Sequence, residues 1–316
     1  MYLGRSIAVV VPAYNEETQI DQVIASMPAE VDRIIVVDDC SSDQTVDRCE
    51  VWAAADPSRV ELVRHRINQG VGAAILSGYQ AALAEGLEVV VVMAGDGQMD
   101  PADLLLIAGP VAEGRVDYAK GNRLFTGQAW KQTPKVRYFG NACLSFLTKI
   151  ASGYWHVADS QSGYTAVSAR ALGLIDLGSV YPRYGFPNDF LIHLNIQNCR
   201  VTDVPVPPRY GIGERSKMRV WKVIPAISWL LFKGFFYRMF QKYVIRDFHP
   251  LVFFYGLGSL MLVVGLALGM VEIYDRVRYG GIAVATVVLV ALLAISGIQM
   301  ILFAMWFDME YNRDLR

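Results

Sequence analysis

The stretch VVVVMAGDGQMDP, residues 89–101, decides the expected fold, because an apolar run ends there in a polar and flexible turn. The four valines and Met93 have the composition of a strand that is buried on both faces. Asp96 then stands between two glycines, so one carboxylate is delivered into an exposed turn. The pattern predicts a strand over 88–93 and a candidate ligand-binding carboxylate directly beyond its end.

Strands and helices alternate in the chain before this stretch. Apolar, β-branched runs predict strands, and amphipathic stretches of about ten or more residues predict helices. The expected strands are Ser6–Val11, Arg33–Val37 and Val60–Val63, and the expected helices are Glu16–Met27, Ser42–Ala55 and Val71–Glu85. This alternation indicates βαβ units and an α/β fold with a mostly parallel sheet. Ligands of such sheets bind beyond the carboxyl ends of the strands, so the polar residues there are the candidate site.

The composition changes after residue 250. Leu251–Val271 contains 21 residues without a charge, and Ile282–Phe307 contains 26. At about 1.5 Å per residue, a helix of either length can cross a hydrocarbon core of about 30 Å. Buried core helices are the alternative, but two uncharged runs of this length are uncommon in soluble domains. We therefore predict two C-terminal transmembrane helices.

The segment Trp221–Phe248 precedes the first expected span and mixes aromatic with basic residues. Arg238, Lys242 and Arg246 recur every four residues, which places a cationic stripe opposite an aromatic face. Such helices are typical of the membrane interface, and the solvated face of a soluble helix is the alternative. We expect an amphipathic interfacial segment here.

These patterns divide the chain into three parts: an α/β domain over 1–219, juxtamembrane amphipathic helices over 220–249 and a transmembrane hairpin over 250–316. Two spans return the C-terminus to the side of the α/β domain. The basic residues before the first span predict that this side is cytoplasmic. The expected protein is an integral membrane protein with the lipid bilayer as one partner. A homo-oligomer is compatible with this, because paired membrane helices often associate.

Charge and cysteine content exclude some functions. The formal net charge is −1, which argues against a nucleic-acid-binding protein. From 209 to 246, however, nine Lys/Arg accompany one acid, which suits a phosphate ligand or an anionic membrane surface. The four cysteines are scattered and form no CxxC pair, so we expect reduced thiols and neither disulfides nor zinc.

Two further polar clusters follow expected strands. In VVVPAYNEE the proline is expected to stop the strand, and in VVDDCSSDQT two acids end it. Acids at strand ends can accept hydrogen bonds from a ribose or a base edge. Capping and turn formation are the alternative, which we favour for Ser41, Ser42 and Asp43. The candidate nucleotide-binding residues are Pro12, Tyr14, Glu16, Asp38, Asp39 and Asp96.

A nucleotide diphosphate at this edge would need a counterion, because the sequence has neither GxGxxG nor GxxxxGK[ST]. A divalent cation on Asp96 meets this need, since Mg²⁺ uses one or two carboxylates together with phosphate oxygens and waters. Gln98 offers an amide oxygen two residues further on. We predict Mg²⁺ or Mn²⁺ as cofactor, held by Asp96 and Gln98.

Together, VVVPAYNEE, VVDDCSSDQT, NQGVGAAILSGY and GDGQMDP resemble a family 2 glycosyltransferase with the Rossmann-like GT-A fold. The likeness is closer to dolichol-phosphate mannose synthase and related polyprenyl-phosphate glycosyltransferases. It continues through KGNRL, RYFGNACLS, DSQSGYTAVSARAL and YGIGERSK, and covers about residues 5–220. One departure concerns the metal motif. The family usually has Asp-x-Asp where this chain has Ala94-Gly95-Asp96.

The resemblance implies a metal-dependent, inverting transfer of a hexose from a UDP- or GDP-sugar to a polyprenyl or dolichyl phosphate. A phosphate monoester is mostly a dianion at neutral pH, so such an acceptor needs no general base. The implied catalytic residues are Asp96, Arg123, Arg137 and Asp159. The implied acceptor-phosphate residues are Arg123, Arg137, Asn141, Arg215, Ser216 and Lys217, and the implied sugar pocket contains Asp159 and Gln161.

Two other interpretations stay open. A processive polysaccharide synthase is the nearest enzyme alternative, although the chain has no QxxRW motif and its two spans do not enclose a channel. A non-catalytic membrane scaffold with a degenerate transferase domain is the second. Its support is Ala94, which stands where the family usually has the first Asp of its metal motif. The sequence does not select the sugar, the base or the lipid. Glucose and mannose are favoured over N-acetylhexosamines.

Overall fold

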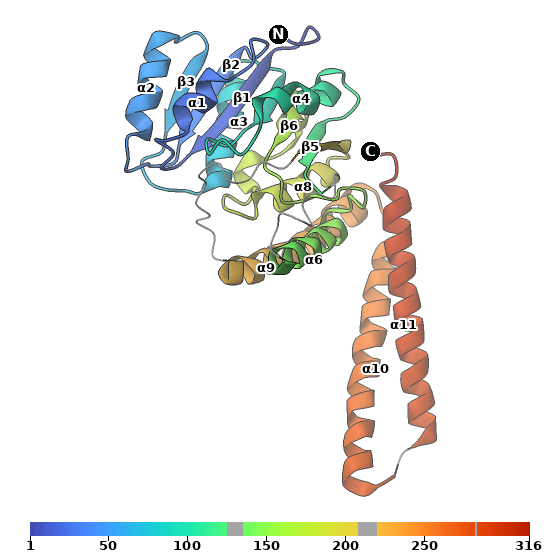
Figure 1. The fold of residues 1–316 in the computed structure, drawn as a ribbon. Coiled ribbons are helices and arrows are strands. Elements are labelled where there is room, and N and C mark those ends of the chain that lie inside the picture. The colour runs from blue at the N-terminus through green and yellow to red at the C-terminus, as the bar shows by residue number, and fades with distance from the viewer. Residues whose placement is uncertain (125–134, 208–219, 282) are drawn as a thin grey trace. The chain divides into compact units, whose positions relative to one another are not determined.

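The computed structural model describes residues 1–124, 135–207, 220–281 and 283–316 (Figure 1). The chain forms two compact units. The first contains Met1–Phe235 together with Leu315–Arg316, and the second contains Phe236–Asp314. The first unit carries the sheet, and the second carries the two long C-terminal helices.

The first unit is built on a seven-stranded sheet with the order β3-β2-β1-β4-β6-β5-β7. Its strands are β1 (Ile7–Ala13), β2 (Arg33–Asp38), β3 (Val60–Arg64), β4 (Val89–Val92), β5 (Tyr118–Asn122), β6 (Thr165–Ser168) and β7 (Val201–Pro205). β6 is antiparallel to both of its neighbours, β4 and β5, whereas the other pairs are parallel. All strands except β6 therefore run in one direction. The predicted α/β fold with a mostly parallel sheet is confirmed.

Helices cover both faces of the sheet: α1 (Ile20–Ala25), α2 (Thr45–Ala55), α3 (Val71–Ala84), α4 (Leu104–Ala112), α7 (Ala169–Leu174) and α8 (Phe186–Ile196), with short 3₁₀ turns η1 (Pro101–Asp103) and η2 (Leu177–Ser179). Two further helices, α6 (Lys135–Ser152) and α9 (Val220–Phe240), pack with α8. Alternate residues of β1 enter different cores, because successive strand side chains point to opposite faces. Val9 and Val11 pack in the core that contains α1 and α4, and Val10 packs in the core that contains α3 and α8. A third apolar cluster joins α6, α8 and α9.

The first strand is longer than expected. Pro12 was expected to stop it, but β1 continues to Ala13. Its pairing with β4 ends at Val10, whereas its pairing with β2 continues through Pro12. Pro12 therefore lies where the strand has lost one neighbour, and a proline without an N–H is tolerated there.

The first helix is shorter than expected and begins at Ile20 instead of Glu16. Side chains of the loop after β2 accept hydrogen bonds from the backbone N–H groups that precede it. Glu16 N donates to Thr45 Oγ1 at 2.9 Å, and Glu17 N donates to Asp43 Oδ2 at 3.3 Å. Asn15 N donates likewise to Ser41 Oγ. Ser41 and Asp43 thus have the structural role that was favoured for them, although they connect two strand-end loops and neither is the N-cap residue of α2.

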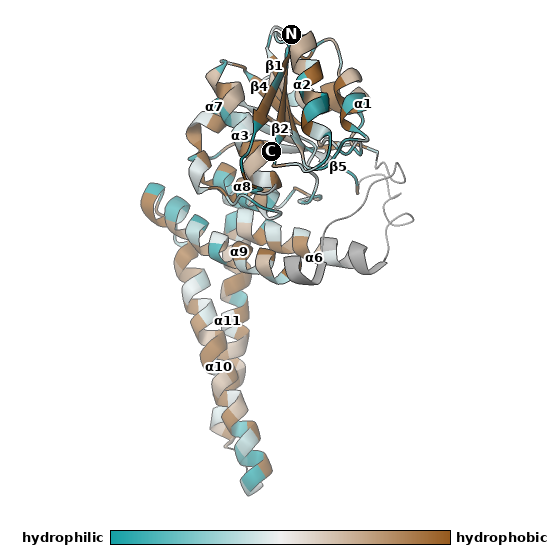
Figure 2. Cartoon of the chain, turned by 90° about the vertical axis from the view of Figure 1, so that its left-hand side faces the viewer, coloured by the Kyte–Doolittle hydropathy of each residue, from teal (hydrophilic) through white to brown (hydrophobic). Residues whose placement is uncertain are grey.

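The second unit contains α10 (Leu251–Tyr279) and α11 (Val284–Tyr311), both long and apolar enough to span a membrane. Figure 2 shows apolar residues along most of both helices and hydrophilic residues at the tip of the hairpin. Only 17% and 11% of their apolar windows are buried, which disfavours the alternative of soluble core helices. The helices approach closely at Gly258 and Gly297. A Cβ on either glycine would lie 2.9 Å from the carbonyl oxygen of the other.

The expected exposed cationic stripe is wrong for two of its three residues, because Arg238 and Lys242 belong to a buried polar cluster in the second unit. Arg238 and Lys242 are completely buried, whereas Arg246 is exposed. Arg238 donates from Nη1 and Nη2 to the two carboxylate oxygens of Asp308, at 2.8 and 3.0 Å. Lys242 Nζ donates to Asn312 Oδ1 at 2.7 Å. The two cations are buried because α11 and the residue after it supply polar partners, which a helical repeat in one segment does not show.

Candidate active site

The candidate site lies at the carboxyl edge of the sheet in the first unit. β1, β2, β4 and β5 all run in one direction, so the loops that follow them emerge at the same edge. The loop before the antiparallel strand β6 opens at this edge as well. The sheet therefore brings together polar residues that are far apart in the sequence, as expected for α/β ligand sites.

The loop after β4 presents Asp96 in a tight turn. Asp96 Oδ1 accepts a hydrogen bond from Gln98 N at 3.0 Å, and Gly97 between them has φ +73°. Only glycine adopts this conformation without strain. Gly95 N donates to Pro12 O at 3.3 Å, which ties the loop to the end of β1. The turn thus holds the Asp96 carboxylate and the Gln98 amide on one short, partly exposed segment.

These donors fit one kind of metal site. Among the described residues, no group of three or more His, Cys, Asp or Glu side chains could hold a metal ion by itself. Mg²⁺, however, commonly takes one or two carboxylates and completes its shell with phosphate oxygens and waters. Asp96 and Gln98 suit a cation that arrives with a diphosphate ligand, and not a site built from protein ligands alone.

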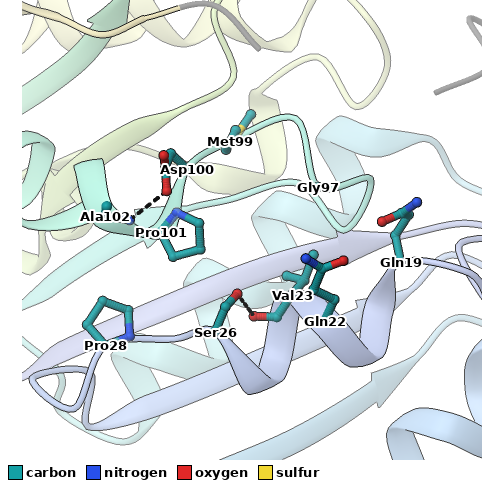
Figure 3. A pocket seen from close by; sticks show the side chains of 10 residues that line it. All are labelled: Gln19, Gln22, Val23, Ser26, Pro28, Gly97, Met99, Asp100, Pro101 and Ala102. Atoms are coloured by element: carbon teal, nitrogen blue, oxygen red, sulfur yellow. Dashed lines mark hydrogen bonds between the residues drawn. The ribbon is translucent and has the colours of Figure 1, made fainter. Parts of the chain in front are cut away.

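A cavity of about 460 Å³ lies beside this loop, between α1 and η1 (Figure 3). Its polar side chains include Gln19, Gln22 and Ser26 of the α1 side and Asp100 of the loop. Two of them bond to nearby backbone: Ser26 Oγ donates to Val23 O, and Asp100 Oδ1 accepts from Ala102 N. We assign no ligand to this cavity, because its lining carries no cluster of charge.

The two acids after β2 have different surroundings. Both carboxylate oxygens of Asp38 lie within hydrogen-bonding distance of Ser41 N, at 3.3 and 3.1 Å, so this acid closes its own turn. Asp39 is 3% exposed and accepts hydrogen bonds from Gln69 N and Gly70 N, both at 2.8 Å. Asp39 therefore fastens the loop over 65–70 to the end of β2.

His65 contacts Asp39, one of the candidate site residues, and the sequence did not indicate this. Its Nδ1 lies 2.8 Å from Asp39 Oδ1, and its Nε2 lies 2.9 Å from Ser77 Oγ on α3. The histidine side chain is only 7% exposed. It joins the end of β2 to α3 at the carboxyl edge of the sheet. Tyr14, in contrast, is exposed after β1, as a side chain with a flat face for a ligand would be.

Arg123 and Asp159 form an ion pair at the same edge. Arg123 Nε and Nη2 donate to the two oxygens of Asp159 at 2.8 and 3.2 Å, and Arg123 N donates to Asp159 Oδ2 at 3.3 Å. Burial alone would raise the pKa of Asp159, but the Arg123 guanidinium and the nearby Lys120 ammonium lower that pKa below its ordinary value. The carboxylate stays ionised and fixes the plane of the guanidinium.

The other expected sugar-pocket residue, Gln161, lies next to Asp159 and bonds to it. Gln161 N donates to Asp159 Oδ1 at 3.2 Å, and its Nε2 donates to Asn188 Oδ1 on α8 at 2.8 Å. The neighbouring Asp189 accepts from Tyr181 N at 2.8 Å and holds a loop.

The remaining expected acceptor residues lie partly outside the described part of the chain. Arg137 and Asn141 fall on α6, whose backbone is described but whose side chains at these two positions are not. Arg215, Ser216 and Lys217 lie outside the described residues. The structure thus groups Asp96, Arg123 and Asp159 at one sheet edge and leaves these five assignments as predictions.

The first unit has the GT-A fold. It is similar to crystal structures of glucosyl-3-phosphoglycerate synthase from Mycobacterium tuberculosis, one with UDP and one with Mn²⁺, UDP-glucose and phosphoglyceric acid. The TM-scores are 0.52 and 0.53, and each match covers 74% of this chain and 80% of the other. At 23% and 24% sequence identity, this likeness establishes the fold alone.

The chain belongs to the family described as glycosyl transferase family 2, whose model matches residues 8–173, just over half of its length. The predicted family is therefore confirmed, and the chain is a glycosyltransferase by family and fold. It is 34% identical over 237 residues to an uncharacterised protein of Methanocaldococcus jannaschii, a match that covers 74% of this chain and 93% of the relative.

Relatives with specific names come from archaea and bacteria. The chain is 30% identical over 216 residues to the UDP-N-acetylglucosamine–dolichyl-phosphate N-acetylglucosaminyltransferase of Methanococcus voltae, covering 65% of this chain and 86% of the relative. It is 29% identical over 203 residues to the undecaprenyl-phosphate mannosyltransferase of Micrococcus luteus, covering 63% of this chain and 82% of the relative.

Proposed function

We propose that this protein transfers a hexose from a UDP- or GDP-linked sugar to a polyprenyl or dolichyl phosphate, with inversion at the anomeric carbon. The observation that carries the proposal is the Arg123–Asp159 pair, which stands at the same sheet edge as Asp96. One carboxylate for a diphosphate-bound cation and one oriented guanidinium for a second phosphate suit a reaction between two phosphorylated substrates. The names of the relatives and the two apolar C-terminal helices support a lipid acceptor.

Donor binding is assigned to the loops after β1, β2 and β4. Tyr14 offers its exposed face to the nucleoside, and Asp39 holds the loop over 65–70 in place. Asp96 and Gln98 would hold Mg²⁺ or Mn²⁺, which when bound supplies positive charge to the departing diphosphate. Solved neighbours of the same fold were crystallised with either metal and UDP.

Acceptor binding is assigned to Arg123, and with it to Arg137, Asn141 and the group over 215–217. A phosphate monoester is mostly a dianion at pH 7, because its second pKa is about 6. Its oxygen attacks the anomeric carbon, and the bond from that carbon to the diphosphate oxygen breaks with its electron pair. No proton is transferred, so Asp159 acts by orienting Arg123. A single displacement of this kind converts an α-linked donor into a β-linked product.

The membrane arrangement completes the proposal. A long polyprenyl chain stays in the bilayer, since each buried CH₂ contributes about 0.8 kcal/mol. The enzyme would therefore be an integral membrane protein with α10 and α11 as its spans. With two spans, and basic residues before the first, the transferase domain and the C-terminus would both face the cytoplasm.

The test uses the full chain in detergent with Mn²⁺ or Mg²⁺ and a short polyprenyl phosphate. UDP-glucose, GDP-mannose and UDP-N-acetylglucosamine are screened for a new glycolipid. We expect one donor to react and Asp96→Asn to abolish the transfer. Asp176→Asn is the matched control, because Asp176 also accepts the N–H two residues on, at 3.1 Å, in the turn of η2. If no donor binds in the presence of metal, the enzyme proposal fails and the scaffold alternative replaces it.

A further inference from the structure

A buried lysine, Lys120, lies close enough to Asp159 to lower its pKa. Lys120 of β5 has no exposed surface, and its ammonium group donates a hydrogen bond to Ser162 O in the loop that also carries Asp159. Lysine is almost never fully buried unless it is paired. The charged groups that act on it are Asp159, Asp203 and Arg123. Lys120 is therefore part of an electrostatic group that includes the candidate site.

Asp203 of β7 lies opposite Lys120 in the β5–β7 register. Its Oδ2 accepts hydrogen bonds from Ala158 N at 2.8 Å and from Asn122 Nδ2 at 2.9 Å. Ala158 directly precedes Asp159, and Asn122 directly precedes Arg123. One carboxylate thus accepts from the backbone N–H of the residue before Asp159 and from the side-chain amide of the residue before Arg123. Asn122 Oδ1 accepts in turn from Leu124 N at 2.9 Å, which closes the turn around Arg123.

The environment of these charges differs from that of an ordinary structural ion pair. Burial lowers the pKa of Lys120 to about 8, although Asp159 and Asp203 act to raise it. Burial raises the pKa of Asp203, and the neighbouring Asp159 charge adds to this rise. Within the described residues, Asp203 Oδ1 is buried without a hydrogen-bond partner. Such an arrangement costs stability, so a role in stability alone does not account for it.

We propose that Lys120 and Asp203 are positioning residues of the transfer reaction, which fix the Arg123 guanidinium at the site by holding Asp159 and the turn over 122–124 in place. The proposal rests on the proposed function, in which Arg123 binds the acceptor phosphate. Lys120 supplies a positive charge, in addition to that of Arg123, that balances the carboxylates of Asp159 and Asp203. Asp203 accepts the hydrogen bonds from Ala158 N and Asn122 Nδ2 that hold the residues next to Asp159 and Arg123.

The experiment compares Lys120→Met, Asp203→Asn and the charge-retaining Lys120→Arg with the wild type. The matched control is Asp117→Asn. Asp117 precedes β5 at its opposite end, is also buried, and accepts from Arg200 N at 2.7 Å beside β7. A loss of stability alone would therefore appear in the control as well. Thermal unfolding of each variant in detergent shows whether it is folded.

The first measurement does not require catalysis. The rate at which phenylglyoxal modifies Arg123 is followed by mass spectrometry on the full-length protein. We expect Lys120→Met and Asp203→Asn to raise this rate about fivefold, the change that corresponds to loss of about one net hydrogen bond. Lys120→Arg and Asp117→Asn stay near the wild-type rate. A wild-type labelling rate in every folded variant would overturn the proposal. If Lys120→Met does not fold, a wild-type rate in Asp203→Asn is enough to overturn it.

The second measurement is sugar transfer. We expect Lys120→Met and Asp203→Asn to raise KM for the polyprenyl phosphate or lower kcat, with KM for the nucleotide sugar unchanged. In the wild type, kcat/KM for the acceptor should fall as the pH rises through about 8, and in Lys120→Met this fall should be absent. A wild type without transfer activity rejects the proposed function, and the labelling rates still decide the role of Lys120 and Asp203. If kcat/KM of Lys120→Met for the acceptor still falls near pH 8 as in the wild type, the positioning role is contradicted.

Discussion

His65 joins Asp39 to Ser77, with 2.8 Å from its Nδ1 to the carboxylate and 2.9 Å from its Nε2 to the hydroxyl. The carboxylate that accepts from His65 also accepts from Gln69 N and Gly70 N. One histidine therefore couples α3 to the loop over 65–70 at the carboxyl edge of the sheet. Because its side chain is nearly inaccessible, we expect His65 to act on a ligand only indirectly, through Asp39.

Replacing this histidine should weaken nucleotide binding more than it weakens the fold. We expect His65→Ala to lower the affinity for UDP or GDP about fivefold, since about one net hydrogen bond to Asp39 is lost. Isothermal titration in the presence of Mn²⁺ measures the change. His156→Ala is the control, because His156 Nε2 bonds to Val201 O, away from the carboxyl edge. Equal affinities in both variants would show that His65 serves packing alone.

Breaking the buried pair Arg238–Asp308 should strongly destabilise the second unit. Asp308→Asn leaves a buried guanidinium without its counter-charge, which costs about 3–5 kcal/mol in comparable cases. Thermal unfolding in detergent should show a large decrease for this variant. Arg246→Met removes an exposed cation of the same segment and should change stability by less than about 0.5 kcal/mol. Similar unfolding temperatures for the two variants would contradict the assignment.

The glycine contact between α10 and α11 gives a second prediction for the hairpin. A side chain on Gly297 would meet Gly258 O and Leu262 Cγ at 2.9 Å, so Gly297→Leu must separate the helices. Overpacking of this kind costs about 1–3 kcal/mol. Gly256→Leu on the same hairpin meets nothing within 4 Å and serves as control. Unfolding in detergent compares the two, and a Gly297→Leu protein as stable as the control would rule out close packing here.

The sequence predicted the parts of the fold whose signal is local. The strands from β1 to β4 and helix α3 are marked by apolar periodicity and by glycine-rich or acidic turns within a few residues. The apolar composition of α10 and α11 is likewise a local property. The family motifs named Asp96, Arg123 and Asp159 separately, because each lies in its own short stretch.

The missed features depend on partners that are distant in the sequence. Asn122 and Asp203 are 81 residues apart, and Arg238 and Asp308 are 70 apart. The helical repeat alone predicts that Arg238 is exposed to solvent. Its burial follows only from the distant segment that supplies Asp308. The antiparallel strand β6 is a similar case, because strand direction depends on the neighbours it meets and not on its four residues.

The pH dependence of stability should distinguish Lys120 from other lysines. Its pKa in the folded state is about 8, compared with 10.5 as the ordinary value. Between these values the unfolded chain binds the proton more tightly than the folded chain does. The free energy of unfolding should therefore increase with pH in this window, by up to about 3.5 kcal/mol at about 1.4 kcal/mol per pKa unit.

The measurement is the difference in unfolding free energy between the wild type and Lys120→Met at several values between pH 7 and 10.5. Groups that titrate in both proteins cancel to first order, so the difference reports Lys120. We expect it to rise with pH while transfer activity falls, because the neutral amine suits burial but no longer balances Asp159 and Asp203. A difference that stays flat would mean that Lys120 remains protonated throughout. In that case its charge is fully compensated in the fold, and the alkaline loss of activity must come from another group.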